Sequence, residues 1–137
     1  MSAERIVQEA RSWLRTPYHH QGRIKGVGVD CAMILCEVYH AAGRVPYIDP
    51  TPYPPDWHLH RTEQRYLGWV EDYAYRVAEP LPGDIALYQF GRAISHAGIV
   101  VDWPMIIHAY HSEGVVLANA TQGALAGRLA GFWRVRE

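Results

Sequence analysis

The pattern of apolar residues changes once along the chain, at the turn-forming residues 80–84, Pro-Leu-Pro-Gly-Asp. Before this turn, apolar residues recur at the three- and four-residue spacing of helix faces. After it, they form short runs rich in Ile, Val and Tyr, which are typical of strands. Helices followed by strands predict an α+β domain with an antiparallel sheet. Since 137 residues suffice for one core, we predict a single domain over residues 1–137.

Three helices are predicted before the turn. Residues 2–14 and residues 59–77 each have apolar side chains at the spacing of one helical face. Between these two segments, Asp30 is the predicted N-cap of a helix that carries Cys31 in its first turn and stops at Gly43.

Two segments between the helices are predicted to be irregular. Residues 18–29 contain three glycines and predict a loop, and residues 44–57 contain five prolines and predict a stiff surface excursion. After the turn we expect a sheet of about five strands, at residues 85–90, 95–102, 105–111, 114–120 and 127–135.

Charge and hydropathy argue against two classes of partner. The net charge is −1 and no cluster of Lys and Arg is present, so we expect no nucleic-acid partner. No apolar run approaches the ~20 residues that a membrane-spanning helix needs, and the first residues lack the apolar stretch of a signal peptide. We therefore expect a protein made in the cytoplasm with no membrane partner, although a component of a larger particle can leave the cell without its own signal.

The two cysteines, Cys31 and Cys36, are expected to be free thiols. Five positions apart in one helix, their Cα atoms would be about 8 to 9 Å apart, which is too far for a disulfide. Cys31 is placed where the positive end of the helix dipole lowers a thiol pKa, which is what a nucleophile requires. Burial as a small apolar residue is the alternative for Cys31 and the favoured role for Cys36.

Two histidines have the placement expected of a catalytic base and its orienting partner. His96 begins an otherwise apolar strand between small neighbours that leave room for another side chain. His108 lies twelve residues later on the next strand, and it can lie beside His96 if the two strands pair. The alternative for each histidine is a structural role in the core or at the surface.

Six short motifs, in this order, resemble the NlpC-type family of cell-wall cysteine peptidases. They are Thr16-Pro17-Tyr18, a glycine-containing loop, Asp30-Cys31, Pro82-Gly83-Asp84, Ser95-His96-Ala97-Gly98-Ile99 and Ile107-His108-Ala109. The likeness extends over nearly the whole chain. Residues 52–57 and the stretch His19-His20-Gln21-Gly22 further resemble the branch encoded in phage and gene-transfer-agent tail clusters.

The resemblance implies a papain-like fold, with N-terminal helices packed on a C-terminal antiparallel sheet, and hydrolysis of peptidoglycan peptides, typically between γ-D-glutamate and a diamino acid. It implies that Cys31 is the nucleophile, paired as a thiolate with the imidazolium of base His96, and that His108 orients His96. Tyr18 matches a tyrosine near the oxyanion site. Asp30 matches the acid that precedes the nucleophile in the family, and we interpret it as a helix cap and a candidate contact for a substrate amine. No metal or cofactor is implied, and phage or gene-transfer-agent tail proteins become expected partners, with the protein on the particle.

One departure from the family keeps two functions open. The family usually has Ser and Gly after the nucleophile, whereas this chain has Ala32 and Met33, which predicts a cleft of different shape. A tail or wall-binding module without catalysis, using the aromatic residues Tyr47, Tyr53, Trp57 and Trp69 for contacts, is the main alternative. A zinc site built from the eight histidines is a further alternative, but HExxH and CxxC patterns are absent from the sequence.

Overall fold

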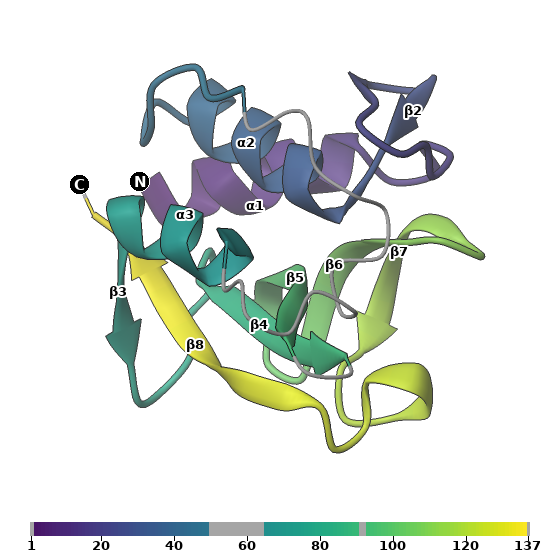
Figure 1. Ribbon diagram of the computed structural model, residues 1–137. Helices are drawn as coiled ribbons and strands as arrows, with labels where there is room; N and C mark the ends of the chain where they lie inside the picture. Colours follow the sequence, from purple (N-terminus) through teal and green to yellow (C-terminus); the bar gives the residue numbers. More distant parts are fainter. Residues whose placement is uncertain (1, 50–64, 91–92, 137) are drawn as a thin grey trace.

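Three helices cover one face of an antiparallel sheet in the computed structural model, which describes residues 2–49, 65–90 and 93–136 (Figure 1). Helix α1 spans Ser2–Ser12, α2 spans Cys31–Ala41 and α3 spans Arg65–Tyr73. Helices α1 and α2 contact each other and both contact the central strands of the sheet. None of the described helices combines the length and hydropathy needed to cross a membrane.

Within the described residues, the sheet has six strands, where about five were expected. They are β3 (Ala74–Val77), β4 (Ile85–Phe90), β5 (Ala93–Asp102), β6 (Met105–Tyr110), β7 (Gly114–Asn119) and β8 (Leu129–Val135). The strand order is β3-β8-β4-β5-β6-β7 and every neighbouring pair is antiparallel. The α+β class, with helices before strands, is therefore confirmed.

The additional strand β3 corrects the prediction of a helix over residues 59–77. Within the described residues, α3 ends at Tyr73, and the next four residues pair with the C-terminal strand β8, from Ala74 opposite Val135 to Val77 opposite Phe132. Four residues are too short a segment for apolar spacing to distinguish a helix from a strand, and here the hydrogen bonds offered by β8 decide the conformation. Residues 59–64 lie outside the described residues.

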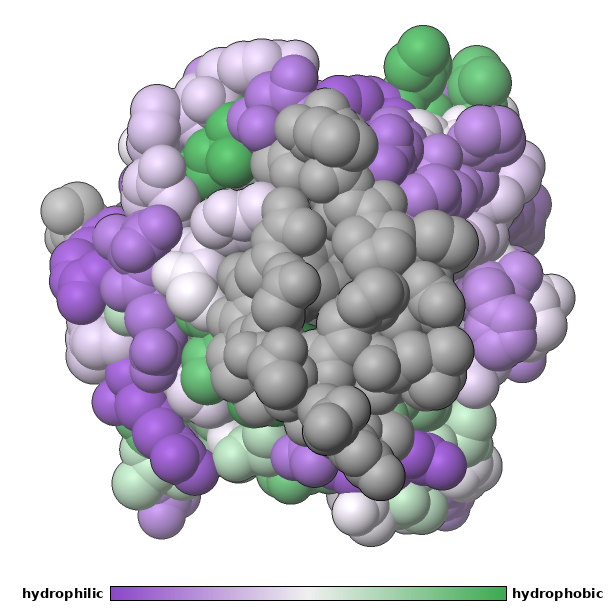
Figure 2. Space-filling model, viewed as in Figure 1, coloured by the Kyte–Doolittle hydropathy of each residue, from purple (hydrophilic) through white to green (hydrophobic). Residues whose placement is uncertain are grey.

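The glycine-containing segment also differs from its prediction as a loop. It contains a short hairpin of β1 (Arg23–Ile24) and β2 (Gly28–Val29). A Cβ on Gly28 would lie 2.7 Å from the Cβ of His19, so only glycine permits this close approach. Ile24 and Val27 are 62% and 68% exposed, and Figure 2 shows hydrophobic side chains projecting where Figure 1 places this hairpin. Of the proline-rich excursion, residues 50–57 lie outside the described residues.

Side chains on the two faces of the sheet form two apolar clusters. Alternation along β4 directs Ile85 and Leu87 toward the helices, and Ala86 and Tyr88 toward the other face. The main cluster contains the apolar faces of all three helices. The smaller second cluster consists of Ala86, Tyr88, Val100, Ile106, Ala120 and Leu125, with Phe90, Trp103 and Phe132 packed against it.

Helix α2 is fixed at both ends. At its start, Asp30 is the N-cap, as predicted, and its side chain accepts hydrogen bonds from the backbone N–H groups of Ala32 and Met33. Near its end, the buried hydroxyl of Tyr39 donates a hydrogen bond of 2.8 Å to the carbonyl of Gly83, in the turn before β4. The cap therefore defines where α2 begins, and the bond to Gly83 connects the helix to the turn before the sheet.

Candidate active site

Cys31 is the first residue of α2 and lies against the sheet. Its side chain is almost buried, and its Sγ lies 3.6 Å from the backbone carbonyl oxygen of Ser95 in β5. Because the amide dipoles of α2 point their positive end at this position, the helix favours the thiolate form of Cys31. The sulfur thus lies beside the residue that directly precedes His96.

A β-bulge at Ser95 brings this carbonyl toward the helix. In the pairing of β4 with β5, Tyr88 lies opposite His96 and Gln89 lies opposite Ile94, so Ser95 is an extra residue. A bulge leaves one residue outside the regular ladder and redirects the neighbouring side chains. The bulge therefore frees the Ser95 carbonyl to face Cys31 and sets the direction of His96.

His96 and His108 meet at hydrogen-bonding distance. Nε2 of His96 lies 2.8 Å from Nδ1 of His108, and both side chains are buried. The pairing of β5 with β6, in which Ile99 lies opposite Ile107, makes the two histidines diagonal neighbours. One ring must supply an N–H and the other a lone pair, so the contact constrains the tautomers of both residues.

Burial keeps both imidazoles neutral. Burial, together with the nearby His108 and His111, lowers the pKa of His96 well below its ordinary value of 6.5. Burial alone lowers the pKa of His108 to about 4. At neutral pH the resting site therefore favours neutral His96, the form of a base, rather than the imidazolium expected from the sequence.

Asp30 links helix α2 to the preceding loop. In addition to its two capping bonds, its carboxylate accepts a 2.7 Å hydrogen bond from the backbone N–H of Gln21, and His20 Nδ1 lies 3.7 Å away. The residue is only 1% exposed. These contacts give Asp30 a structural role beside Cys31, and a contact with a substrate amine stays a prediction.

Tyr18 lies near the same end of α2. It forms a parallel bridge with Val29, two residues before Cys31. Burial and the negative charges of the Cys31 thiolate and of Asp30 raise the pKa of Tyr18 above its ordinary value of 10. The phenol therefore stays protonated at neutral pH and can act as a hydrogen-bond donor close to the sulfur.

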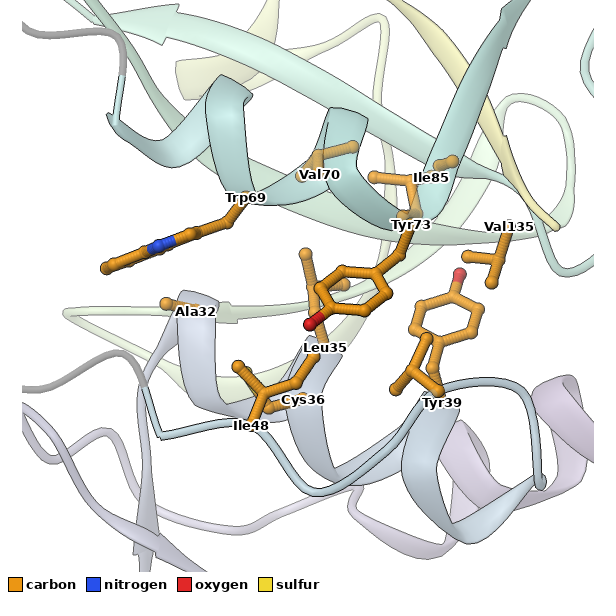
Figure 3. A pocket seen from close by; sticks show the side chains of 12 residues that line it. Ala32, Leu35, Cys36, Tyr39, Ile48, Trp69, Val70, Tyr73, Ile85 and Val135 are labelled. Atoms are coloured by element: carbon orange, nitrogen blue, oxygen red, sulfur yellow. The ribbon is translucent and has the colours of Figure 1, made fainter.

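Cys36 lies apart from this site, in an apolar pocket of about 60 Å³ between α2 and α3 (Figure 3). Burial raises the pKa of its thiol to about 11, so it stays protonated at neutral pH. The pocket is lined by Ala32, Leu35, Cys36, Tyr39, Val45, Ile48, Trp69, Val70, Tyr73, Ala74, Ile85 and Val135. Packing is therefore the role that the geometry gives to Cys36.

The two residues that depart from the family pattern are buried. Met33 is fully buried in the main cluster and Ala32 is 6% exposed, so the bulk of Met33 enters the core. Among the described residues, no group of three or more His, Cys, Asp and Glu side chains is arranged to hold a metal. Tyr53, Trp57, His58 and His60 lie outside the described residues.

The sequence patterns did not predict the aromatic rings around His96 or the bulge at Ser95. Tyr88, Phe90 and Tyr110 all have ring contacts with His96. Alternation along β4 places Tyr88 and Phe90 on one face, but only the register of β5 shows that His96 lies opposite Tyr88. No sequence signal marked the bulge.

Comparisons with known proteins identify the same fold. The model of the NlpC/P60 family matches residues 15–134, and no curated protein sequence matches the chain. The NlpC/p60 domain of the peptidoglycan hydrolase SagA superposes with a TM-score of 0.63 at 20% identity, covering 100% of both chains. RipD from Mycobacterium tuberculosis, described as a non-catalytic NlpC/p60 domain protein adapted to peptidoglycan binding, has a TM-score of 0.61 at 12% identity, over 99% of this chain and 97% of RipD.

Some structural relatives are much longer than this chain. An NlpC/P60 family protein from Bacillus cereus has a TM-score of 0.68 at 17% identity, and the match covers 97% of this chain but 40% of that protein. The present chain therefore corresponds to about two fifths of the Bacillus protein. Together these likenesses confirm the papain-like α+β fold, with six strands in place of the expected five.

Proposed function

Since this chain belongs to the NlpC/P60 family, we propose that it is a cysteine peptidase that hydrolyses peptidoglycan stem peptides, at the bond between γ-D-glutamate and a diamino acid. The observation that carries the proposal is a pair of contacts. The sulfur of Cys31 contacts the carbonyl of Ser95, and the next residue, His96, contacts His108. The name of SagA, a peptidoglycan hydrolase, supports the choice of substrate.

The proposed reaction begins with transfer of the Cys31 thiol proton to Nδ1 of His96. The sulfur attacks the scissile carbonyl carbon, and the C=O electron pair moves to oxygen. The backbone N–H of Cys31 and the Tyr18 hydroxyl donate hydrogen bonds to this oxyanion. One such preorganised donor is typically worth about 3 to 4 kcal/mol of activation free energy.

His96 then returns the proton to the leaving amine as the C–N bond breaks, which leaves a thioester on Cys31. Water attacks the thioester, His96 takes a proton from that water, and the thiol is restored as the acid product leaves. Throughout, the Nε2–H of His96 donates to Nδ1 of His108. The low pKa of His108 keeps it neutral and able to accept this bond while His96 carries charge.

Digestion of purified muropeptides, with products identified by mass, tests the proposal. We expect the wild type and Cys36→Ala to release the same fragments, and Cys31→Ala and His96→Ala to release none. Cys36→Ala is the matched control because it removes the same group from the same helix. Equal product from wild type and Cys31→Ala would exclude Cys31 as the nucleophile.

A non-catalytic wall-binding module is the second candidate function. It is favoured by Ala32 and Met33 in place of the usual Ser and Gly, and by the description of RipD as non-catalytic. Sedimentation with purified sacculi separates the two functions. Binding without any product from wild-type protein would support the module, whereas product formation that depends on Cys31 would exclude it.

The proposed setting is a phage or gene-transfer-agent particle whose tail proteins are partners, with synthesis in the cytoplasm and action on the cell wall. Its support is the resemblance of His19-His20-Gln21-Gly22 and residues 52–57 to the tail-encoded branch. Mass spectrometry of purified particles from the source cells tests it. Recovery of the chain only in the particle-free fraction would contradict this setting.

A further inference from the structure

Aromatic side chains enclose the His96 ring. The ring centroids of Phe90 and Tyr110 lie 5.8 Å and 5.7 Å from that of His96, at interplanar angles of 80° and 86°. Tyr88 lies at 6.1 Å and 50°. Edge-to-face contacts of this kind favour one mutual orientation of two rings, so they restrict how the His96 ring can turn.

Phe90 differs from the two tyrosines because a charged side chain covers it. The guanidinium carbon of Arg128 lies 4.5 Å from the centroid of the Phe90 ring. Arg128 is itself held, since its Nε donates a 3.1 Å hydrogen bond to the Ala124 carbonyl and its own carbonyl accepts a 2.8 Å bond from the N–H of Gln89. The Phe90 ring is therefore fixed between His96 and the turn that carries Ala124.

Building on the proposed function, we propose that Phe90, held by Arg128, is a positioning residue that keeps the His96 ring turned with its Nε2 toward His108. The hydrogen bond to His108 alone leaves rotation about the Cβ–Cγ bond loosely restrained, because the energy wells of this torsion are broad. The ring contact with Phe90 narrows that rotation. If the His96 ring turns away from this orientation, the base is misplaced, and the rate of proton transfer depends steeply on the position of the base.

The Phe90 ring also limits the access of water to His96. Several titratable and charged groups surround His96. His108 and Tyr110 lie on β6 with His111 directly after it, and Tyr88 lies on β4. The Cys31 sulfur lies by the neighbouring Ser95, and Arg128 lies over the Phe90 ring. Burial is the main cause of the lowered pKa of His96. Replacing Phe90 by a smaller side chain admits water, so the pKa of His96 rises toward 6.5.

Phe90→Leu, with Phe132→Leu as the matched control, tests the proposal. These are the two phenylalanines of the chain; both pack against the second cluster, but Phe132 has its edge-to-face contact with Trp103. On muropeptide substrate we expect kcat to fall roughly three- to tenfold in Phe90→Leu with KM within about twofold, from the usual energy of such a ring contact. Phe132→Leu should leave kcat unchanged, and Phe90→Tyr should keep kcat near the wild-type value. Arg128→Gln should lower kcat, but by less than Phe90→Leu does.

NMR titration of the His96 imidazole provides a readout that does not need turnover. A higher pKa of His96 in Phe90→Leu, but not in Phe132→Leu, supports the proposal, and it does so even if the wild type cleaves no muropeptide and the proposed function fails. An unchanged pKa of His96 in Phe90→Leu overturns it. The proposal is also overturned if kcat falls equally in both leucine variants, or if Phe90→Leu changes only KM. This holds even if Cys31-dependent hydrolysis is established.

Discussion

Replacing His108 by glutamine tests how strongly burial of this residue makes the fold sensitive to acid. The pKa of His108 is about 4 in the folded protein and about 6.5 in an unfolded chain. As the pH falls from 6.5 to 4, the unfolded chain takes up a proton that the folded chain does not, so stability is lost across this window. The full difference corresponds to about 3 kcal/mol, of which about 2 kcal/mol is lost between pH 7.5 and pH 5.

Urea unfolding followed by tryptophan fluorescence at these two pH values measures the effect. We expect the loss of stability between pH 7.5 and pH 5 to be about 2 kcal/mol smaller in His108→Gln than in the wild type. His96 accounts for part of the remaining loss, because its pKa is also lowered. His40→Gln, at an exposed histidine of α2, is the control and should behave as the wild type. An identical loss in His108→Gln and wild type would refute the reasoning.

Three further predictions concern the residues around the site. Asp30→Ala should lower the free energy of unfolding by about 2 kcal/mol, measured in urea, because three backbone N–H groups lose their acceptor. Gly98→Ala should cost about 1 to 3 kcal/mol, because its Cβ would lie 2.5 Å from Cδ1 of Ile106, and adding Ile106→Val should recover part of that loss. At neutral pH iodoacetamide should label Cys31 before Cys36, as peptide mapping can show, because the Cys36 pKa is about 11.

Local signals in the sequence predicted the start of α2. A good N-cap residue directly before an apolar helical pattern places Cys31 in the first turn, and Gly43, with a φ of 77°, ends the helix as expected. The five predicted strands formed because each combines β-branched residues with flanking turn residues. These features depend on neighbours close in sequence, which a single chain reveals.

Features that depend on pairing between distant residues could not be predicted. Residues 74–77 became a strand because β8 lies beside them, and β8 follows more than fifty residues later. The approach of His96 to His108 requires the register of β5 and β6, and the extra residue Ser95 shifts the register of β4 and β5. The hydrophobic pattern alone does not fix these offsets, because a register shift of two residues keeps every side chain on the same face of the sheet.

The hydrogen bonds at the two ends of α2 fix the position of the Cys31 sulfur independently of the shape of the surrounding surface. Asp30 is hydrogen-bonded to Gln21 at one end of α2 and Tyr39 to Gly83 near the other, so Cys31 is held in place without a bound peptide. Ordering this helix should therefore cost little of the binding free energy when a ligand binds. Selection for a new binding target can then alter the exposed tip of the β1–β2 hairpin without moving the Cys31 sulfur.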